Sequence, residues 1–385
     1  MLTDAQKAII TATVPVLREN GVALTKHFYN RMLTHNPELR QIFSMTHQRT
    51  GHQAGALASA VLAYAQNIDN LAVLEQAVTH IAHKHVSVGI RAEHYPIVGH
   101  HLIESIREVL GEAATPDIID AWSAAYAQLA DVFINAEAQL YKDATLAPGG
   151  WSGWRSFVIT EKRQETADVV SFILKPVDNG RVIDVVPGQY LSVRVYIKDE
   201  NLVQPRQYTI TEGAEDHLRI TVKHIAAEGD KPEGMVSKTL HGAEVGTVVD
   251  IAAPMGEFTL PAGNDPLVLL SAGIGITPMV AMLKGVEEGR EVLHMHTCRN
   301  PEDFVLRREV EGAIQGHAGR RLVEHYTETA GRPDEKTIAS MVVPQADYVI
   351  CGPDGYIVMA VRALKEAGVP ANKIRFEHFS VGTPA

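Results

Sequence analysis

Cysteine is scarce in this chain, which has only Cys298 and Cys351 among 385 residues. The two lie far apart in the sequence, so a disulfide framework is excluded and a reducing compartment, the cytoplasm, is expected. The amino terminus, "MLTDAQKAII", carries an acid where a secretory signal carries bases, so no signal peptide is expected. "TDAQ" instead predicts a capping box, in which Thr3 and Gln6 open a helix.

Long uninterrupted hydrophobic runs are also missing. The most apolar stretch is "LVLLSAGIGITPMVAML" at 267–283, which carries no charge. Gly273, Gly275 and Pro278 interrupt it, so a continuous helix of membrane-spanning length is not expected.

Basic residues are outnumbered by acidic ones. Lysine and arginine total 35 against 46 aspartates and glutamates, which gives a formal net charge of −11. A surface that binds duplex nucleic acid needs a basic patch, and the sequence has no basic run. Nucleic acid is therefore not an expected partner.

The length of the chain predicts two or three domains, because single hydrophobic cores stop growing at about 250–300 residues. Only five of the 19 prolines fall in the first 150 residues, where apolar residues recur at helical spacing. This stretch ends in the turn cluster "LAPGGWSGW" and predicts an all-helical domain over 1–146. The expected helices are 4–20, 21–35, 52–66, 71–86, 94–110 and 117–142.

From about residue 155 the apolar period changes to two, which is the period of strands. Turn signals such as Asn179-Gly180 and Pro187-Gly188 separate the strand-like segments. They predict a small antiparallel β-barrel over 151–262. The segments are "FVIT", "VVSFILKPV", "QYLSVRVYI", "RQYTIT", "LRITVKHI" and "VVDIAAP".

The remainder of the chain, 263–385, alternates apolar strand runs with helical patterns. Strand runs such as "LVLLSA" and "YVICGP" are followed by helical patterns at 277–288 and 355–367. This alternation predicts an α/β, doubly wound parallel sheet, whose ligand site lies at the carboxyl ends of the strands. The expected fold class is therefore multidomain, with an all-α, an antiparallel β-barrel and an α/β unit in that order.

Residues 80–90, "HIAHKHVSVGI", place three histidines on one predicted helix. Each helical residue turns by about 100°, so His80 and His83 lie near one face, which is expected to meet water, and His85 lies on the apolar side. One helix cannot direct all three at a common ion. His85 is either a hydrogen-bonded core residue or a lone metal ligand. A lone imidazole fits a haem iron better than zinc, which takes three or four protein ligands.

Two glycine-rich turns follow predicted strands. In "SAGIGITPM", Gly273 and Gly275 let the backbone approach a ligand closely, and the following Thr277 and Pro278 suit the start of a helix. The ending of this turn departs from the G-x-G-x-x-G fingerprint, so an ordinary strand-to-helix turn is an alternative interpretation. A second turn, "CGPDG", leaves a later strand, and two such turns favour a nucleotide-binding crevice.

The predicted barrel carries two further motifs. "RQYTI" places Arg206 and Tyr208 on one face of a strand, although an ordinary exposed Arg–Tyr pair would give the same pattern. "GMVSKTL" places Ser237 where a helix begins, which is an anion-binding position. In order and spacing, "RQYT", "GMVS", "AGIGITPM" and "CGPDGY" resemble the ferredoxin–NADP reductase-like flavoproteins. The resemblance implies FAD and either NADH or NADPH as cofactors.

By this resemblance Arg206 pairs with the FAD pyrophosphate, Tyr208 stacks on the isoalloxazine, and the Thr209 hydroxyl approaches the reactive flavin nitrogen. Serine is the usual residue at the position of Thr209. Phe379 in "EHFS" matches an aromatic residue that covers the flavin, although "CFGP" is more usual there than the ending "HFSVG" of this chain. The other implied FAD contacts are Tyr190, Gln207 and Ser237, and the implied nicotinamide-nucleotide contacts are Gly273, Ile274, Gly275, Ile276, Thr277, Pro278, Cys351, Gly352 and Pro353.

The helical region resembles a globin, and a globin followed by such a reductase resembles the flavohaemoglobins over essentially the whole chain. The motifs that carry this resemblance are "HFYNRML", "HQAGAL", "KHVSVGI", "EHYPIVG" and "INAEAQLY". It implies a haem b with His85 as the proximal ligand and with His80 and His83 as bystanders. The other implied residues are Tyr29, Gln53 and Leu57 in the distal pocket, Phe43 against the porphyrin, Tyr95 and Glu137 orienting His85, and Lys84 at the haem edge, for which a solvated surface lysine is the alternative.

The activity that the resemblance implies is that of a nitric oxide dioxygenase. NAD(P)H reduces FAD, FAD passes electrons to the haem, and O2 and nitric oxide react there to give nitrate, which removes nitric oxide. A cytoplasmic monomer is expected. The alternatives are a haem-based oxygen or redox sensor and a globin that binds lipid in its distal pocket. The choice between NADH and NADPH stays open, because no acidic residue near "CRNPED" is clearly placed to bind a ribose hydroxyl.

Overall fold

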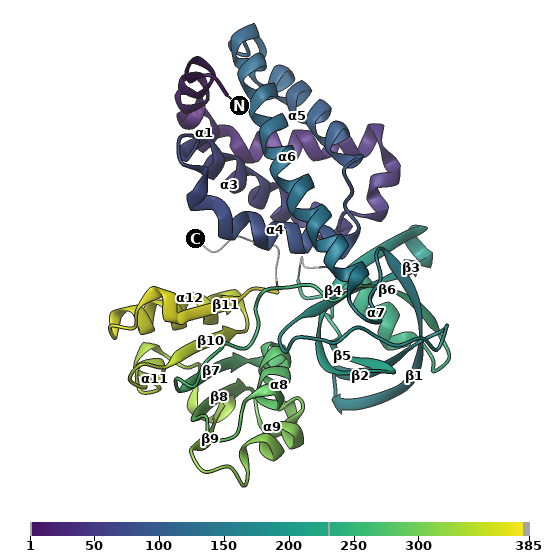
Figure 1. Cartoon of the computed structure of the whole chain (residues 1–385), viewed down its shortest axis with the longest axis vertical. Coiled ribbons are helices and arrows are strands. Elements are labelled where there is room, and N and C mark those ends of the chain that lie inside the picture. Colours follow the sequence, from purple (N-terminus) through teal and green to yellow (C-terminus); the bar gives the residue numbers. More distant parts are fainter. Residues whose placement is uncertain (1, 230–231, 380–385) are drawn as a thin grey trace.

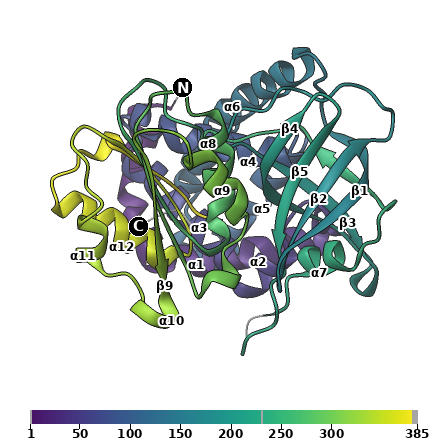
Figure 2. The ribbon, with the colours of Figure 1, turned by 90° about the horizontal axis from the view of Figure 1, so that it is seen from below.

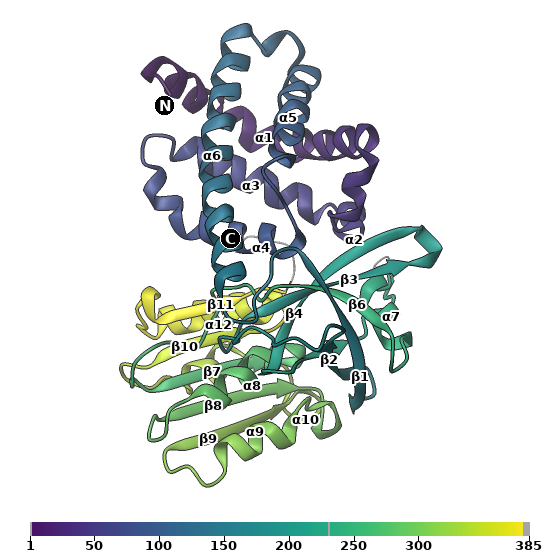
Figure 3. The same ribbon diagram turned by 45° about the vertical axis from the view of Figure 1, so that its right-hand side comes forward.

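The computed structural model describes residues 2–229 and 232–379, which form three packed units (Figure 1). The helical unit lies at the top of that view, the barrel at the lower right and the parallel sheet at the lower left, and the turned view in Figure 3 keeps this arrangement. The expected order of an all-α, an antiparallel β-barrel and an α/β unit is confirmed.

The first unit is built of helices that pack around an apolar interior. The helix α1 begins at the expected capping box, in which the Thr3 side chain accepts a hydrogen bond from the Gln6 N–H at 3.2 Å. The main helices are α1 (Asp4–His35), α2 (Met45–Thr50), α3 (His52–Gln66), α4 (Glu75–Val88), α5 (His94–Leu110) and α6 (Pro116–Leu146), and the 3₁₀ helices are η1 (Pro37–Gln41), η2 (Leu71–Leu74) and η3 (Gly111–Ala113).

The prediction of two helices over 4–20 and 21–35 was wrong, because α1 is continuous and contains Pro15. At Gly21 an added Cβ would lie 3.5 Å from the Ala58 Cβ of α3. This distance is an ordinary van der Waals contact, so Gly21 lies inside the continuous helix and packs against α3.

The second unit is a closed barrel with the strand order β1-β2-β5-β4-β3-β6. Its paired strands are antiparallel, and the inward-facing residues, such as Phe157, Phe172 and Ile220, are fully buried. A regular alternation of buried and exposed residues, which the period of two predicted, is not observed in β2, β3 and β5, because these strands are buried along most of their length. The strands are β1 (Trp154–Thr166), β2 (Val169–Pro176), β3 (Tyr190–Ile197), β4 (Leu202–Ala214), β5 (His217–Lys223) and β6 (Val248–Ala252), with η4 (Lys198–Glu200) and α7 (Met235–Gly242).

The third unit is a parallel five-stranded sheet in the order β11-β10-β7-β8-β9. The order reverses next to β7, and the two glycine turns follow β7 and β10 at this switch point. The strands are β7 (Leu267–Ala272), β8 (Val292–Cys298), β9 (Arg320–Tyr326), β10 (Asp347–Cys351) and β11 (Ile374–Glu377), and the helices are η5 (Gly273–Gly275), α8 (Ile276–Gly285), η6 (Pro301–Asp303), α9 (Arg307–Ile314), α10 (Thr327–Ala330), α11 (Glu335–Ala339), α12 (Asp354–Glu366) and η7 (Ala371–Lys373).

Helices α8 and α9 lie between the sheet and the barrel when the molecule is seen from below (Figure 2). The two cysteine thiols, on Cys298 and Cys351, are buried and free. Within residues 2–229 and 232–379, none of the helices combines the length and the apolar character that crossing a bilayer requires.

Candidate functional site

Helices α4, α5 and α6 bring His85, Tyr95 and Glu137 together. The His85 Nδ1 lies 2.7 Å from the Glu137 carboxylate and 3.2 Å from the Tyr95 hydroxyl, and that hydroxyl also donates to Glu137. Glu137 is only 2% exposed. Burial and the neighbouring Glu137 raise the pKa of Tyr95, which keeps its hydroxyl protonated as a donor.

The protonation of His85 follows from this arrangement. A carboxylate can only accept hydrogen bonds, so the His85 Nδ1 carries the proton and donates it to Glu137. In the neutral imidazole with this tautomer, the Nε2 atom keeps its lone pair, which is the form that binds a metal. The donor set fits a haem iron, because within the described part of the chain no group of three or more His, Cys, Asp or Glu side chains converges as a protein-only metal site would require.

His83 does not face water as expected, and His80 does so only in part, with 44% of its side chain exposed. The His83 Nδ1 accepts a hydrogen bond from the Gly256 N–H at 3.2 Å, and the His80 ring lies 3.6 Å from the Glu257 carboxylate. Both partners lie in the segment after the barrel, so this helix face meets another domain. A helical period shows which residues share a face, but it does not show what covers that face.

A second group of residues, from α1, the segment after η1, and α3, packs as one cluster that includes Tyr29, Phe43 and Leu57. The rings of Tyr29 and Phe43 meet edge to face, with their centroids 5.8 Å apart. Tyr126 packs both against this cluster and against the cluster around Tyr95. The two groups therefore line a common interior of the helical unit.

Hydrogen bonds fix the orientation of the Tyr29 hydroxyl group. The Gln53 Oε1 accepts from the Gln48 Nε2 at 2.8 Å, so the amide NH₂ of Gln53 is the group that is free to donate to the Tyr29 oxygen. Burial raises the pKa of Tyr29, and the hydrogen bond with Gln53 opposes this effect only in part. Tyr29 therefore keeps its own proton available for a further acceptor.

Strands β3 and β4 place the expected flavin residues side by side. Tyr190 pairs directly with Thr209, and Leu191 pairs with Tyr208. The Arg206 guanidinium donates to the Pro205 carbonyl at 2.7 Å but makes no ion pair with any carboxylate that the structure describes, and burial lowers its pKa. A half-buried cation without a counter-charge fits a diphosphate group.

Two other residues expected to contact FAD are already engaged through their side chains. The Gln207 amide donates to the Ser87 hydroxyl on α4 at 3.1 Å, and the Ser237 hydroxyl donates to the Gly234 carbonyl at 2.9 Å. Gln207 thus links the barrel to the helix that carries His85. Phe379 is 47% exposed, and the rest of the "HFSVG" ending, from Ser380 onward, lies outside the described residues.

The two glycine turns of the parallel sheet touch each other. A Cβ on Gly275 would lie 2.4 Å from the Cys351 carbonyl oxygen, and Gly273 has φ +53°, so neither position accepts an ordinary side chain. Glycine at both positions fits the close backbone approach of a nucleotide. Among the expected contacts the side chains of Ile276, Thr277, Pro278 and Cys351 are buried, which leaves backbone groups as the contacts, together with Ile274, Gly352 and Pro353.

Glu377 is a candidate residue that the sequence reasoning missed. It pairs with Cys351 across β10 and β11, and burial raises its pKa, whereas the attraction of Lys84 opposes this shift. Burial also lowers the pKa of Lys84, which is half-buried. The only sequence signal for Glu377 was its position in "EHF", next to the aromatic residue.

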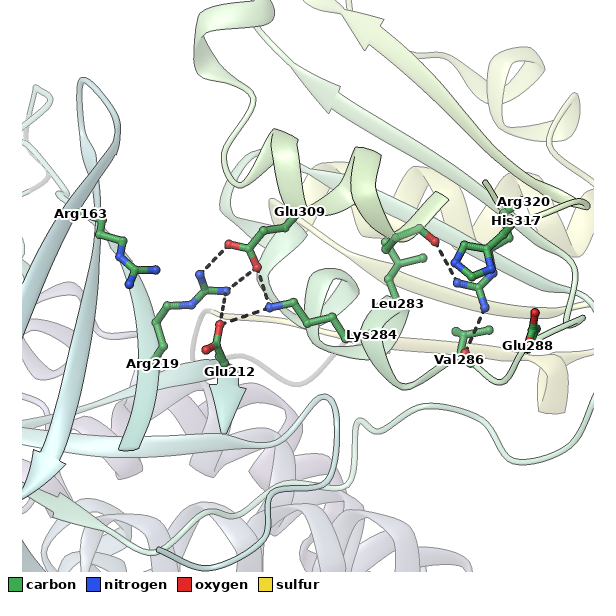
Figure 4. Close-up of a pocket in the computed structure, with 11 residues that line it drawn as sticks. Arg163, Glu212, Arg219, Leu283, Lys284, Val286, Glu288, Glu309, His317 and Arg320 are labelled. Atoms are coloured by element: carbon green, nitrogen blue, oxygen red, sulfur yellow. Dashed lines mark hydrogen bonds and ion pairs between the residues drawn. The ribbon is translucent and has the colours of Figure 1, made fainter. Parts of the chain in front are cut away.

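An ion-pair cluster joins the barrel to helices α8 and α9 beside a cleft of about 760 Å³ (Figure 4). Arg219 of β5 is 2% exposed and donates to both carboxylate oxygens of Glu309 at 2.6 Å. The Arg219 Nε donates to the Thr211 hydroxyl at 3.0 Å. Lys284 of α8 lies 2.6 Å from Glu309 and 3.5 Å from Glu212 of β4. This cluster fixes helix α8 to strand β4.

A histidine pair is buried inside the parallel sheet. His294 and His296 of β8 are no more than 1% exposed, and both bond to the Ser271 hydroxyl, at 3.0 and 2.8 Å. Burial lowers the pKa of His294 to about 3 and that of His296 well below its usual value. Both rings are therefore neutral near pH 7.

Comparison with known proteins covers the whole chain. The globin family model matches residues 26–133, the oxidoreductase FAD-binding domain matches 156–260, and the oxidoreductase NAD-binding domain matches 269–362. The flavohemoprotein of Bordetella pertussis is 47% identical over 99% of both chains. That of Vibrio cholerae is 41% identical over 98% of both.

Solved structures agree with these matches. A flavohemoglobin from Malassezia yamatoensis with bound FAD and haem has a TM-score of 0.90 at 31% identity, over 98% of this chain and 100% of that one. The FAD/NAD-binding domain of a nitric oxide dioxygenase from Vibrio cholerae has a TM-score of 0.50 at 31% identity, over 58% of this chain and 97% of that one.

Proposed function

Because the chain belongs to the flavohemoprotein family, we propose that it is a nitric oxide dioxygenase, which uses O2 and NADH or NADPH to convert nitric oxide to nitrate. The relative from Vibrio cholerae that carries this name supports the proposal. The observation that carries it is the hydrogen-bonded set of His85, Tyr95 and Glu137, which occurs in one chain with a complete reductase.

The chain is an oxidoreductase, and its cofactors are haem, FAD and a nicotinamide nucleotide. When bound, these groups supply a hydride, its separation into single electrons, and an iron centre at which O2 is activated. The contributions of the chain are to hold these groups, to orient them and to keep protons on stated atoms.

On the proximal side, we assign His85 as the iron ligand, through Nε2. Glu137 and Tyr95 hold the ring in one orientation and keep the proton on Nδ1. A carboxylate that accepts this proton raises the electron donation of the imidazole. Such donation favours oxygen activation over simple oxygen carriage.

On the distal side, we assign Tyr29 as the hydrogen-bond donor to the oxygen substrate. Its hydroxyl stays protonated because burial raises its pKa, and Gln53 fixes its direction. Fixed donors aimed at developing negative charge need no reorganisation during the reaction. Leu57 and Phe43 exclude water from the same space.

In the reductase we assign Arg206 to the FAD diphosphate, with Tyr190, Tyr208 and Thr209 around the ring system and Ser237 at the start of α7. The two glycine turns hold the nicotinamide nucleotide through backbone groups. We also propose domain bounds of 1–146, 151–262 and 263–385, and a monomer in the cytoplasm.

The first experiment is an absorption spectrum of the cofactor-loaded protein before and after anaerobic addition of NADH under carbon monoxide. The expected result is loss of the flavin band together with formation of the ferrous carbonyl band and, in a separate sample free of carbon monoxide, rapid nitric oxide consumption once O2 is admitted. If the flavin bleaches but nitric oxide is not consumed, the chain is a reductase-coupled globin of another kind, and the proposal is wrong.

Tyr29→Phe is expected to lower nitric oxide consumption by roughly 100-fold, because one preorganised donor is removed. Oxygen should also dissociate faster from the reduced protein. Tyr64→Phe is the matched control, since the Tyr64 hydroxyl is buried in the same unit and donates to the Ala125 carbonyl at 3.1 Å. Equal oxygen dissociation in Tyr29→Phe and in the unsubstituted protein would refute the assigned role of Tyr29.

A further inference from the structure

Gln204 of β4 is fully buried, and its side chain crosses from the barrel to the helical unit. The Gln204 Nε2 donates to the Arg40 carbonyl at 2.8 Å and to the Phe43 carbonyl at 3.4 Å. The Gln204 Oε1 accepts from the Met45 N–H at 3.0 Å. A single carboxamide thus binds three backbone groups of segment 40–45.

Because Gln204 is buried, its carboxamide needs hydrogen-bond partners. A buried carboxamide is costly unless its donors and acceptor are satisfied, and here the Nε2 also donates to the Val203 carbonyl at 3.0 Å. The Arg40 carbonyl lies near the end of η1, and the Met45 N–H lies at the start of α2. Helix ends leave such backbone groups unpaired. Gln204 satisfies these groups from another domain.

One further hydrogen bond joins the segment to the same strand, since the Gln41 Oε1 accepts from the Val203 N–H at 2.5 Å. A cavity of about 1030 Å³ is lined by Gln41, Ile42 and Val88 on the helical side and by Val203 and Tyr196 on the barrel side. Apolar packing is incomplete where such a cavity lies. Directional hydrogen bonds therefore fix the segment relative to the barrel.

The position of Gln204 connects the two proposed redox sites. Segment 40–45 contains Phe43, which packs against Tyr29. On the same strand Gln204 is followed, two and four residues later, by Arg206 and Tyr208. Fixing the segment to the strand fixes the haem side of the molecule to the flavin side.

We propose that Gln204 is a positioning residue for electron transfer, holding segment 40–45 and the haem beside it at a set distance and orientation from the flavin. This inference rests on the proposed sites for haem and FAD, but it does not depend on nitric oxide being the substrate. Each NADH would supply a hydride to the flavin, and the flavin would pass the two electrons to the haem iron one at a time.

The test is a stopped-flow measurement on the full-length, cofactor-loaded protein, mixed anaerobically with NADH under carbon monoxide. In Gln204→Ala, flavin reduction should keep its rate, whereas formation of the ferrous carbonyl should slow by about tenfold, because small misplacements of reacting groups are costly. Equal slowing of both steps, or of neither, would overturn the proposal.

Gln204→Glu separates positioning from general damage. When ionised, the carboxyl group introduced at position 204 still accepts a hydrogen bond from the Met45 N–H, but it repels the Arg40 and Phe43 carbonyls. Electron transfer should therefore be slow at neutral pH. When protonated, the same group regains a donor, and burial raises the pKa of a carboxyl group. The rate relative to the unsubstituted protein should therefore recover as the pH falls, and a ratio independent of pH would contradict the proposal.

Hydrogen–deuterium exchange provides a readout that does not depend on activity. The Met45 amide should exchange faster in Gln204→Ala. Gln164→Ala is the matched control, because the Gln164 Nε2 donates to two carbonyls within the barrel, those of Thr166 and Val169. Protection of segment 40–45 that is unchanged in Gln204→Ala, or equally reduced in both variants, would refute the proposal even if nitric oxide consumption were established.

Discussion

Arg219→Met is expected to lower the free energy of unfolding by about 3 kcal/mol, the lower end of the range for breaking a buried ion pair. The substitution leaves the Glu309 carboxylate without its two short hydrogen bonds and removes the hydrogen bond that the Arg219 Nε donates to the Thr211 hydroxyl. We expect a loss at the lower end of this range because the Glu309 side chain is 27% exposed and still forms an ion pair with Lys284, at 2.6 Å. A urea titration of the FAD-loaded protein, followed by flavin release, measures the change in the midpoint.

Arg163→Met is the matched control, because Arg163 lines the same cleft. Its ion pair with Glu161 is half exposed on both sides, at 50% and 49%, so its removal should change stability by less than about 0.5 kcal/mol. The double variant Arg219→Met with Glu309→Met should recover most of the loss, since it leaves no unpaired buried charge. A double variant as unstable as Arg219→Met would show that the pair is not the cause.

Acid is expected to destabilise the parallel sheet through His294, by about 3 kcal/mol between pH 6.5 and about pH 4.5. The pKa of His294 is lowered from its usual 6.5 to about 3 in the folded chain. Between about pH 3 and pH 6.5, His294 therefore binds a proton in the unfolded chain but not in the folded chain. The stabilisation is therefore complete above pH 6.5, and it is lost progressively as the pH falls toward 3. His296 acts in the same direction.

The measurement is the urea midpoint at a series of pH values, for the unsubstituted protein and for His294→Leu. The variant should show a shallower pH dependence below pH 6.5, because it removes one buried group that must be neutral. His317→Leu serves as the control, since His317 is exposed in the same unit. If His294→Leu lost stability with acid as steeply as the unsubstituted protein, the buried imidazole would not be the cause.

Local patterns predicted most of the architecture. The period of two identified all six barrel strands, and the strand–helix alternation identified the five strands of the parallel sheet. The short helices α2, α10 and α11 were not expected, because a segment of four to six residues contains too little periodicity to recognise. The two helices expected over 4–20 and 21–35 form one helix, α1, which continues through Pro15.

The candidate site was predictable to the extent that its residues fall in motifs. The geometry around His85, with Glu137 as its partner 52 residues later, agrees with the expected roles of both residues, which stay proposals. Gln204 and Arg219 lie in no motif that the sequence reasoning used, and their significance comes from contacts across 161 and 90 residues. For the same reason the exposed-looking face of His80 and His83 proved to be a domain contact.

Strand β4 has contacts with all three units of the protein. Gln204 and Gln207 reach the helical unit, and Thr211 and Glu212 meet the cluster that holds α8 and α9. The consequence concerns modularity. A chimera that replaced the globin at the linker alone would set a foreign surface against these glutamines, and a replaced nucleotide domain would leave Glu212 without Lys284. The exchangeable parts of this protein are therefore bounded by the contacts of one strand rather than by the linkers, and a working graft has to carry the matching side chains of β4 with it.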